Sequence, residues 1–165
     1  MNILEQSITW AKGEQFEGMC IAIGGLVSII LAGLLWKFGT TINAKSLVIP
    51  TLVFGLLFTI MGSYMVYSNG ERQKSFQKNY ETNSSNFISA EKKRVEDFQF
   101  MYPTSLAISA ICFLITLIAF VWSKNPNFHA ISIILSVFGL SLIIIDYFSK
   151  ERAAIYYIQI LQNLQ

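Results

Sequence analysis

Four long apolar runs constrain this sequence more than any other feature. They cover residues 18–36, 47–67, 104–122 and 128–146, and none contains a lysine or an arginine. At 1.5 Å of rise per residue, each run forms a helix about 30 Å long, the thickness of a bilayer's hydrocarbon layer. Unpaired backbone polar groups are costly in lipid, so such runs must be helical. The sequence therefore predicts an all-α integral membrane four-helix bundle, with residues 1–165 forming a single membrane domain.

Composition agrees with a membrane protein. Hydrophobic residues make up 53% of the chain and charged residues only 13%, whereas soluble domains have about 25% charged residues. This balance argues against a water-soluble globular protein. The 17 residues before the first run carry three acids and one lysine, and no small-residue cleavage pattern follows the run. We therefore do not expect a cleaved signal peptide.

The distribution of charge predicts the orientation in the membrane. Four spans place both termini and the loop 68–103 on one side. That side holds nine of the twelve lysines and arginines, because only Lys37, Lys45 and Lys124 fall on the other. Positively charged loops stay in the cytoplasm. We expect a multi-pass protein of the bacterial inner (plasma) membrane, with both termini cytoplasmic.

The segments outside the spans have amphipathic character. We expect the loop 68–103 to form a cytoplasmic helical hairpin between spans two and three, with a polar break at residues 83–86. In the tail 147–165, apolar residues recur every three or four positions, which predicts an amphipathic C-terminal helix. Its apolar stripe consists of Ala154, Tyr157, Ile158, Leu161 and Leu164. We expect these segments mainly to pack on one another; the alternatives are docking on partner helices or lying among the lipid headgroups.

Small residues recur about every four positions in each span. Such residues let helices approach closely in lipid, where apolar contact adds little. Close packing is the favoured interpretation, and a polar pore lining is the alternative. The residues are Cys20, Gly24, Ser28 and Ala32 in the first span, Gly55, Thr59 and Ser63 in the second, Ser105, Ser109, Cys112, Thr116 and Ala119 in the third, and Ser132, Ser136 and Gly139 in the fourth.

Three carboxylates mark a candidate site at the cytoplasmic rim. Glu14 and Glu17 precede the first span, and Asp146 ends the fourth. If these helices are neighbours, the three groups converge and could bind a cation or a proton, since ionisable groups at membrane depth are costly. The favoured alternative is a set of solvated, salt-bridged rim charges, with Asp146 paired to Lys150 four residues later.

Two further surfaces are candidates for binding. Phe87, Val95 and Phe98 would form a docking surface on the predicted hairpin, where apolar residues recur at helical spacing. Lys92, Lys93 and Arg94 form a short basic run that could contact anionic lipid headgroups, although Arg94 could instead pair with Glu91.

The sequence has no recognisable catalytic or cofactor motif. The two cysteines form no CxxC pair and His129 is the single histidine, so we expect no metal, no catalytic residue and no cofactor. A net charge of +2 without a basic patch gives no support for nucleic-acid binding.

Three functions stay open at this stage. The first expectation is a non-enzymatic protein that acts through protein contacts, as a subunit, regulator or immunity-type factor. The second is a homo-oligomeric channel or small transporter that uses the rim carboxylates. The third is a membrane enzyme acting on lipid or quinone, which would need those carboxylates and a bound metal. The expected partners are membrane lipid and either a membrane protein or further copies of the chain.

Overall fold

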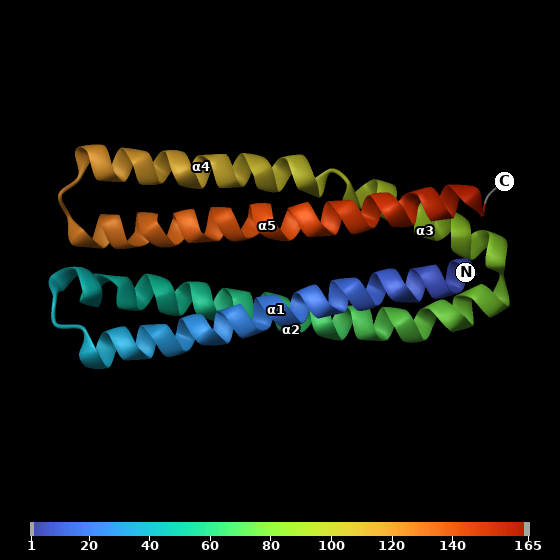
Figure 1. Cartoon of the computed structure of the whole chain (residues 1–165), viewed down its shortest axis with the longest axis horizontal. Coiled ribbons are helices and arrows are strands. Elements are labelled where there is room, and N and C mark those ends of the chain that lie inside the picture. The colour runs from blue at the N-terminus through green and yellow to red at the C-terminus, as the bar shows by residue number, and fades with distance from the viewer. Residues whose placement is uncertain (1, 164–165) are drawn as a thin grey trace.

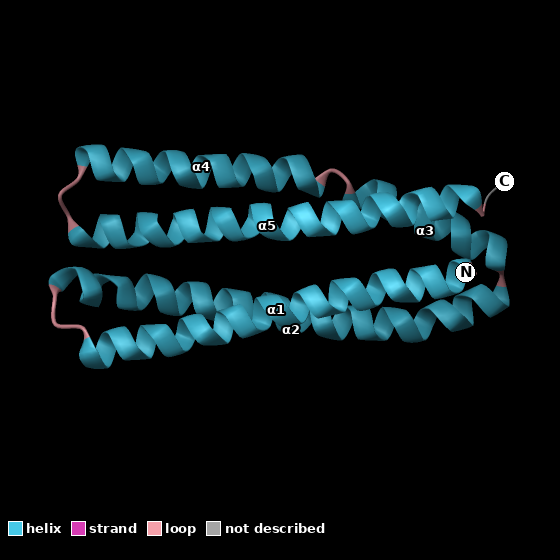
Figure 2. Ribbon diagram, in the orientation of Figure 1, coloured by secondary structure: helices cyan, strands magenta, loops and turns pink. Residues whose placement is uncertain are grey.

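The computed structural model describes residues 2–163 as five α-helices, and those residues include no strand (Figure 2). The helices are α1 (Ile3–Phe38), α2 (Ile42–Thr82), α3 (Ser84–Phe98), α4 (Met101–Trp122) and α5 (Pro126–Gln162). Four segments are long and apolar enough to cross a membrane: α1, α2, α5 and the stretch Ser84–Trp122, whose apolar part is α4. The predicted all-α bundle is confirmed, and the four segments support a multi-pass membrane protein.

The helices form two antiparallel hairpins that lie side by side (Figure 1). The loops of α1/α2 and α4/α5 lie at one end of the molecule, and both termini lie at the other. These loops are shorter than predicted, since α1 continues to Phe38 and α2 begins at Ile42. We call the end with the termini the terminal side.

The predicted helical hairpin between the second and third spans is present. Helix α2 continues beyond its span to Thr82, and α3 turns back toward α4 (Figure 1). Asn83 makes the turn, because its side-chain oxygen accepts a hydrogen bond from the Asn86 backbone at 2.9 Å and so caps α3.

A seven-residue repeat organises the contact between α1 and α2. Such a repeat keeps one seam facing the neighbouring helix. A Cβ atom added at Gly62 would lie 2.3 Å from the backbone nitrogen of Ala22, and one at Gly25 would lie 2.4 Å from that of Thr59. Only glycine allows this approach of two backbones. The buried positions of the repeat are Ala11, Gly18, Gly25 and Ala32 in α1, and Gly55, Gly62, Asn69 and Phe76 in α2.

Of the small-residue stripe predicted for the first span, only Ala32 belongs to this seam, and Cys20, Gly24 and Ser28 lie on a different face. A Cβ at Gly24 would meet nothing within 4 Å, and Cys20 is exposed. Successive residues of a helix point about 100° apart around its axis. Because Gly25 faces α2, its neighbour Gly24 points away from α2. In the second span the prediction is correct for Gly55 and Thr59, which contact the backbone of α1.

Hydroxyl groups join α4 to α5 within the membrane. Ser109 Oγ donates to the Gly139 carbonyl oxygen at 2.9 Å, and Thr116 Oγ1 donates to that of Ser132 at 2.7 Å. Ser136 Oγ donates in turn to Thr116 Oγ1 at 2.8 Å. The small-residue packing predicted for the third and fourth spans is therefore confirmed.

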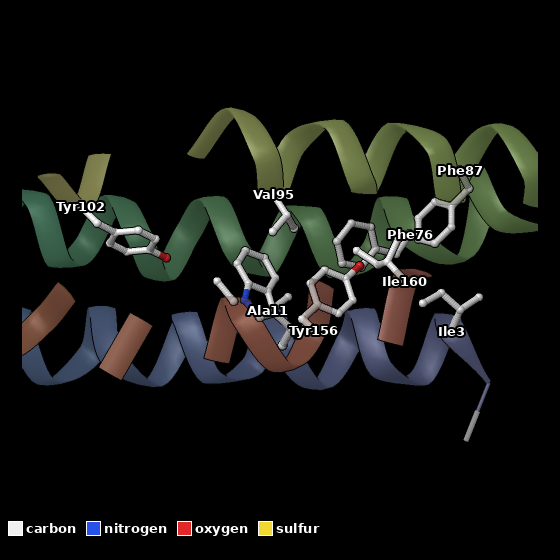
Figure 3. Packing of buried hydrophobic residues seen from close by; sticks show 10 residues of the cluster. Ile3, Ala11, Phe76, Phe87, Val95, Tyr102, Tyr156 and Ile160 are labelled. Carbon is white, nitrogen blue, oxygen red and sulfur yellow. The ribbon is translucent and has the colours of Figure 1, made fainter. Parts of the chain in front are cut away.

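Beyond the spans, four helical segments form what we call the juxtamembrane bundle: residues 3–17, 68–82, 84–98 and 147–162. They surround one continuous apolar core (Figure 3). Packing of these segments on one another, the favoured expectation, is thus what the structure shows. The core consists of Ile3, Trp10, Ala11, Phe76, Phe87, Val95, Ala153, Tyr156 and Ile160 from these segments, together with Tyr102 from the first turn of α4.

The C-terminal part of α5 buries a different face from the predicted one. Its buried residues are Ala153, Tyr156 and Ile160, whereas Ala154, Ile158 and Leu161 are exposed and Tyr157 is half-buried. Leu164 lies outside the described residues. The prediction failed because this helix is apolar on two opposite faces, and periodicity alone does not say which one meets the bundle.

Candidate functional site

The centre of the juxtamembrane bundle is a pair of stacked rings. The Trp10 and Tyr156 ring centroids lie 5.5 Å apart with an interplanar angle of 16°. The Tyr156 hydroxyl lies 2.6 Å from Ser7 Oγ and donates to Glu91 Oε2 at 2.8 Å. Burial raises the pKa of the Tyr156 phenol, and the negative charge of Glu91 raises it further. The hydroxyl therefore stays protonated and remains a donor.

Two arginines complete this polar network. Arg94 Nε donates to Glu91 Oε1 at 3.0 Å, and a second guanidinium nitrogen pairs with Glu91 Oε2. The same guanidinium lies 4.3 Å from the Trp10 ring centroid, a cation–π contact. Arg72 donates to Asn69 Oδ1 at 2.7 Å; burial, and then repulsion from Arg94, lowers its pKa. The buried carboxylate of Glu91 is thus paired and hydrogen-bonded.

A second charged cluster lies where α1 and α5 leave the membrane. Arg152 bridges two carboxylates: it donates to Glu14 Oε1 at 2.9 Å and also pairs with Glu17 Oε2. The side chains of Glu14 and Glu17 are only 7% and 10% exposed. Ser149 Oγ lies 3.4 Å from the same Glu14 oxygen. One positive charge between two negative ones leaves the cluster with a net charge of −1.

The structure brings two of the three predicted rim carboxylates together and separates the third. Asp146 accepts a hydrogen bond from Ser105 of α4, so it is turned toward α4 rather than toward Glu14 and Glu17. Within residues 2–163, no three His, Cys, Asp or Glu side chains are arranged to hold a metal ion. The expected convergence is corrected to a pair of glutamates that share Arg152.

Sequence reasoning missed Arg152, although the sequence contains a signal for it. Ser149, Arg152 and Tyr156 are spaced by three and four residues and so share one face of α5. Ser149 and Tyr156 are both buried. A basic residue between two buried polar residues on one helical face indicates a cation held by a carboxylate of a neighbouring helix.

The predicted docking and headgroup residues are divided between the core and the surface. Phe87 and Val95 are buried in the juxtamembrane bundle, and of the predicted docking residues only Phe98 is exposed. Arg94 is turned inward to Glu91, and Lys92 lies 3.9 Å from Glu96. The three basic residues therefore do not form one common surface, since helical neighbours point in different directions.

One apolar surface of the juxtamembrane bundle lacks a covering helix within the described residues. Ile155 and Ile158 of α5 are 53% and 56% exposed, and Leu161 is exposed beside them. We call these three residues the exposed α5 face. They lie 9 to 15 positions after Asp146, which places them about 14–22 Å along the helix beyond the end of the span.

Comparison of the chain with models of known protein families, with curated proteins and with solved structures found no match.

Proposed function

We propose that this protein acts non-enzymatically through protein–protein contacts on the terminal side of the membrane, as a subunit, regulator or immunity-type factor. The observation that carries the proposal is the exposed α5 face. Contiguous exposed apolar residues mark interaction surfaces, and this helix uses its opposite apolar face to close the juxtamembrane bundle.

The position of the exposed α5 face favours a protein partner over lipid. Helix α5 continues from its span without interruption to Gln162 and runs along the long axis of the molecule (Figure 1). Ile158 lies about 18 Å beyond Asp146 by helical rise, whereas the headgroup layer is only about 5–8 Å thick on each side. If the spans run parallel to the membrane normal, Ile158 therefore lies beyond the hydrocarbon and headgroup layers.

We further propose that the terminal side is cytoplasmic and that the protein belongs to the bacterial inner membrane. The support is the charge distribution: nine of the twelve lysines and arginines fall on the terminal side. The partner then approaches from the cytoplasm or from a neighbouring position in the same membrane.

Native mass spectrometry of the tagged protein, released from lipid nanodiscs, tests the proposal. The wild type is compared with Ile158→Glu, which places a charge on the exposed α5 face. The matched control is Ala90→Glu, which adds the same charge at an exposed position of α3. We expect a second protein of defined mass on the wild type and the control, and at least tenfold less of it on Ile158→Glu.

Three outcomes oppose the proposal. A wild type that carries no protein partner, or a partner retained equally by Ile158→Glu, contradicts docking through this face. A closed ring of identical chains would favour a homo-oligomeric channel instead.

A further inference from the structure

An apolar groove lies between α1 and α5 in the half of the membrane next to the terminal side. It has a volume of about 610 Å³, within the range of about 300–1,000 Å³ of small-molecule sites. Its α1 wall runs from Phe16 to Ser28, which is about 18 Å by helical rise. That length matches one leaflet of a hydrocarbon layer about 30 Å thick.

The wall of the groove on α1 includes the three residues of the predicted small-residue stripe that lie outside the α1–α2 seam. Cys20, Gly24 and Ser28 line it, and their small side chains leave the space open. The opposite wall is apolar and comes from α5, where Val137, Ile144 and Phe148 contribute.

The end of the groove at the terminal side is charged. Glu17 and Arg152 both line it. Glu17 Oε2 is paired with Arg152, but Glu17 Oε1 is buried and has no hydrogen-bond partner among residues 2–163. A buried carboxylate oxygen without a donor is costly, so a donor supplied by a ligand would stabilise the site. The Arg152 side chain is 30% exposed. Its Nε and Nη2 atoms bond Glu14 and Glu17, which leaves Nη1 to pair with a phosphate.

We propose that this groove is a binding site for a phospholipid with a primary ammonium headgroup, phosphatidylethanolamine in chemical terms. An acyl chain lies along Gly24 and Ser28, the phosphate pairs with Arg152, and the ammonium donates to Glu17. The net charge of −1 on Glu14, Glu17 and Arg152 disfavours an anionic headgroup. A choline headgroup carries no N–H and cannot satisfy Glu17 Oε1. The site is independent of the exposed α5 face.

Competition in nanodiscs tests the site. The protein is placed in a phosphatidylcholine bilayer that contains equal amounts of phosphatidylethanolamine and phosphatidylglycerol, and native mass spectrometry identifies the retained lipids. Gly24→Leu fills the groove. Gly33→Leu is the matched control, because a Cβ at either glycine meets nothing within 4 Å and Gly33 does not line the groove. Glu17→Gln removes the anionic partner while keeping the shape.

We expect the wild type and Gly33→Leu to retain phosphatidylethanolamine over both other lipids, and Gly24→Leu to lose it. The loss of one charge-assisted hydrogen bond makes the preference of Glu17→Gln for phosphatidylethanolamine roughly tenfold weaker. Preferential retention of phosphatidylglycerol or phosphatidylcholine by the wild type would overturn the proposal. Equal retention of phosphatidylethanolamine by Gly24→Leu and Gly33→Leu would also overturn it, whatever the result with Glu17→Gln.

Discussion

Helices α1 and α2 pack through different kinds of residue inside and outside the membrane. Within the spans, α1 and α2 touch through Gly25 and Gly62, where added Cβ atoms would collide with backbone. Outside the spans, the same seven-residue repeat continues through Ala11 and Phe76, and large rings such as Trp10 fill the space. In lipid, helices gain little from burying apolar side chains, so close backbone contact replaces it. In water, burial of rings is itself the stabilising term.

This difference predicts different sensitivities for the two regions. The membrane-spanning part should lose stability when side-chain volume is added at the contact between α1 and α2. The juxtamembrane bundle should lose stability when a buried side chain is shortened or when one partner of a buried ion pair is removed. The free energy of unfolding in a fixed mixed-micelle system, followed by helical circular dichroism, compares the two.

The largest effect is expected for Gly62→Leu. The added side chain starts 2.3 Å from the Ala22 backbone nitrogen, and backbone cannot yield cheaply, so we expect destabilisation by more than about 3 kcal/mol. Gly33→Leu adds the same atoms in open space and should change the stability by less than about 0.5 kcal/mol. Similar values for the two variants would show that the helices are not in backbone contact.

Trp10→Ala should destabilise the juxtamembrane bundle by about 3–5 kcal/mol. The substitution removes the ring on which Tyr156 and Arg94 pack and leaves a cavity beside them. Hydrogen exchange should rise in residues 3–17, 68–82, 84–98 and 147–162, while the spans keep their protection. A uniform rise over the whole chain would instead indicate that the two regions unfold as one unit.

Glu91→Gln should cost about 2 kcal/mol, since it removes the charge that pairs with Arg94 and accepts from Tyr156. The control is Glu96→Gln, whose exposed carboxylate forms an ion pair with Lys92 and accepts a hydrogen bond from the Tyr157 hydroxyl. Surface pairs contribute less than about 1 kcal/mol. If the control lost as much stability as Glu91→Gln, burial of Glu91 would not explain its role.

Alkaline pH should weaken the bundle through Tyr156. The pKa of this phenol is raised in the folded protein, so the stabilising effect is complete below the ordinary tyrosine pKa of about 10 and is lost as the pH rises above it. The maximal slope for one group is about 1.4 kcal/mol per pH unit. Tyr156→Phe should lose this part of the slope, and Tyr147→Phe, at an exposed position, should keep it.

Ser109→Ala should have the smallest effect, about 0.6 kcal/mol, which is typical of a hydrogen bond between helices in a membrane. The bond to the Gly139 carbonyl is lost, but alanine keeps the small size that the contact needs. A loss above about 2 kcal/mol would mean that hydrogen bonding, rather than close packing, joins α4 to α5.

The sequence predicted what depends on length and hydropathy, and it missed what depends on the choice of helix face. The four spans and the hairpin around Asn83 follow from apolar runs and a polar break. Gly24 and Gly25 are equally small, and only the repeat through Gly18, Gly25 and Ala32 identifies the packed face. The seven-residue spacing was the available signal. Arg152 was missed because its partners Glu14 and Glu17 are more than 130 residues away along the chain.

Hydrogen exchange of α3 in the wild-type protein in nanodiscs tests the central claim most directly, because α3 has no membrane to protect it. If the juxtamembrane bundle is closed around Trp10 and Tyr156, amides of α3 near Phe87 and Val95 exchange as slowly as those of residues 7–14 in α1. Exchange of α3 at the rate of an unstructured peptide, with residues 7–14 still protected, would contradict the closed bundle.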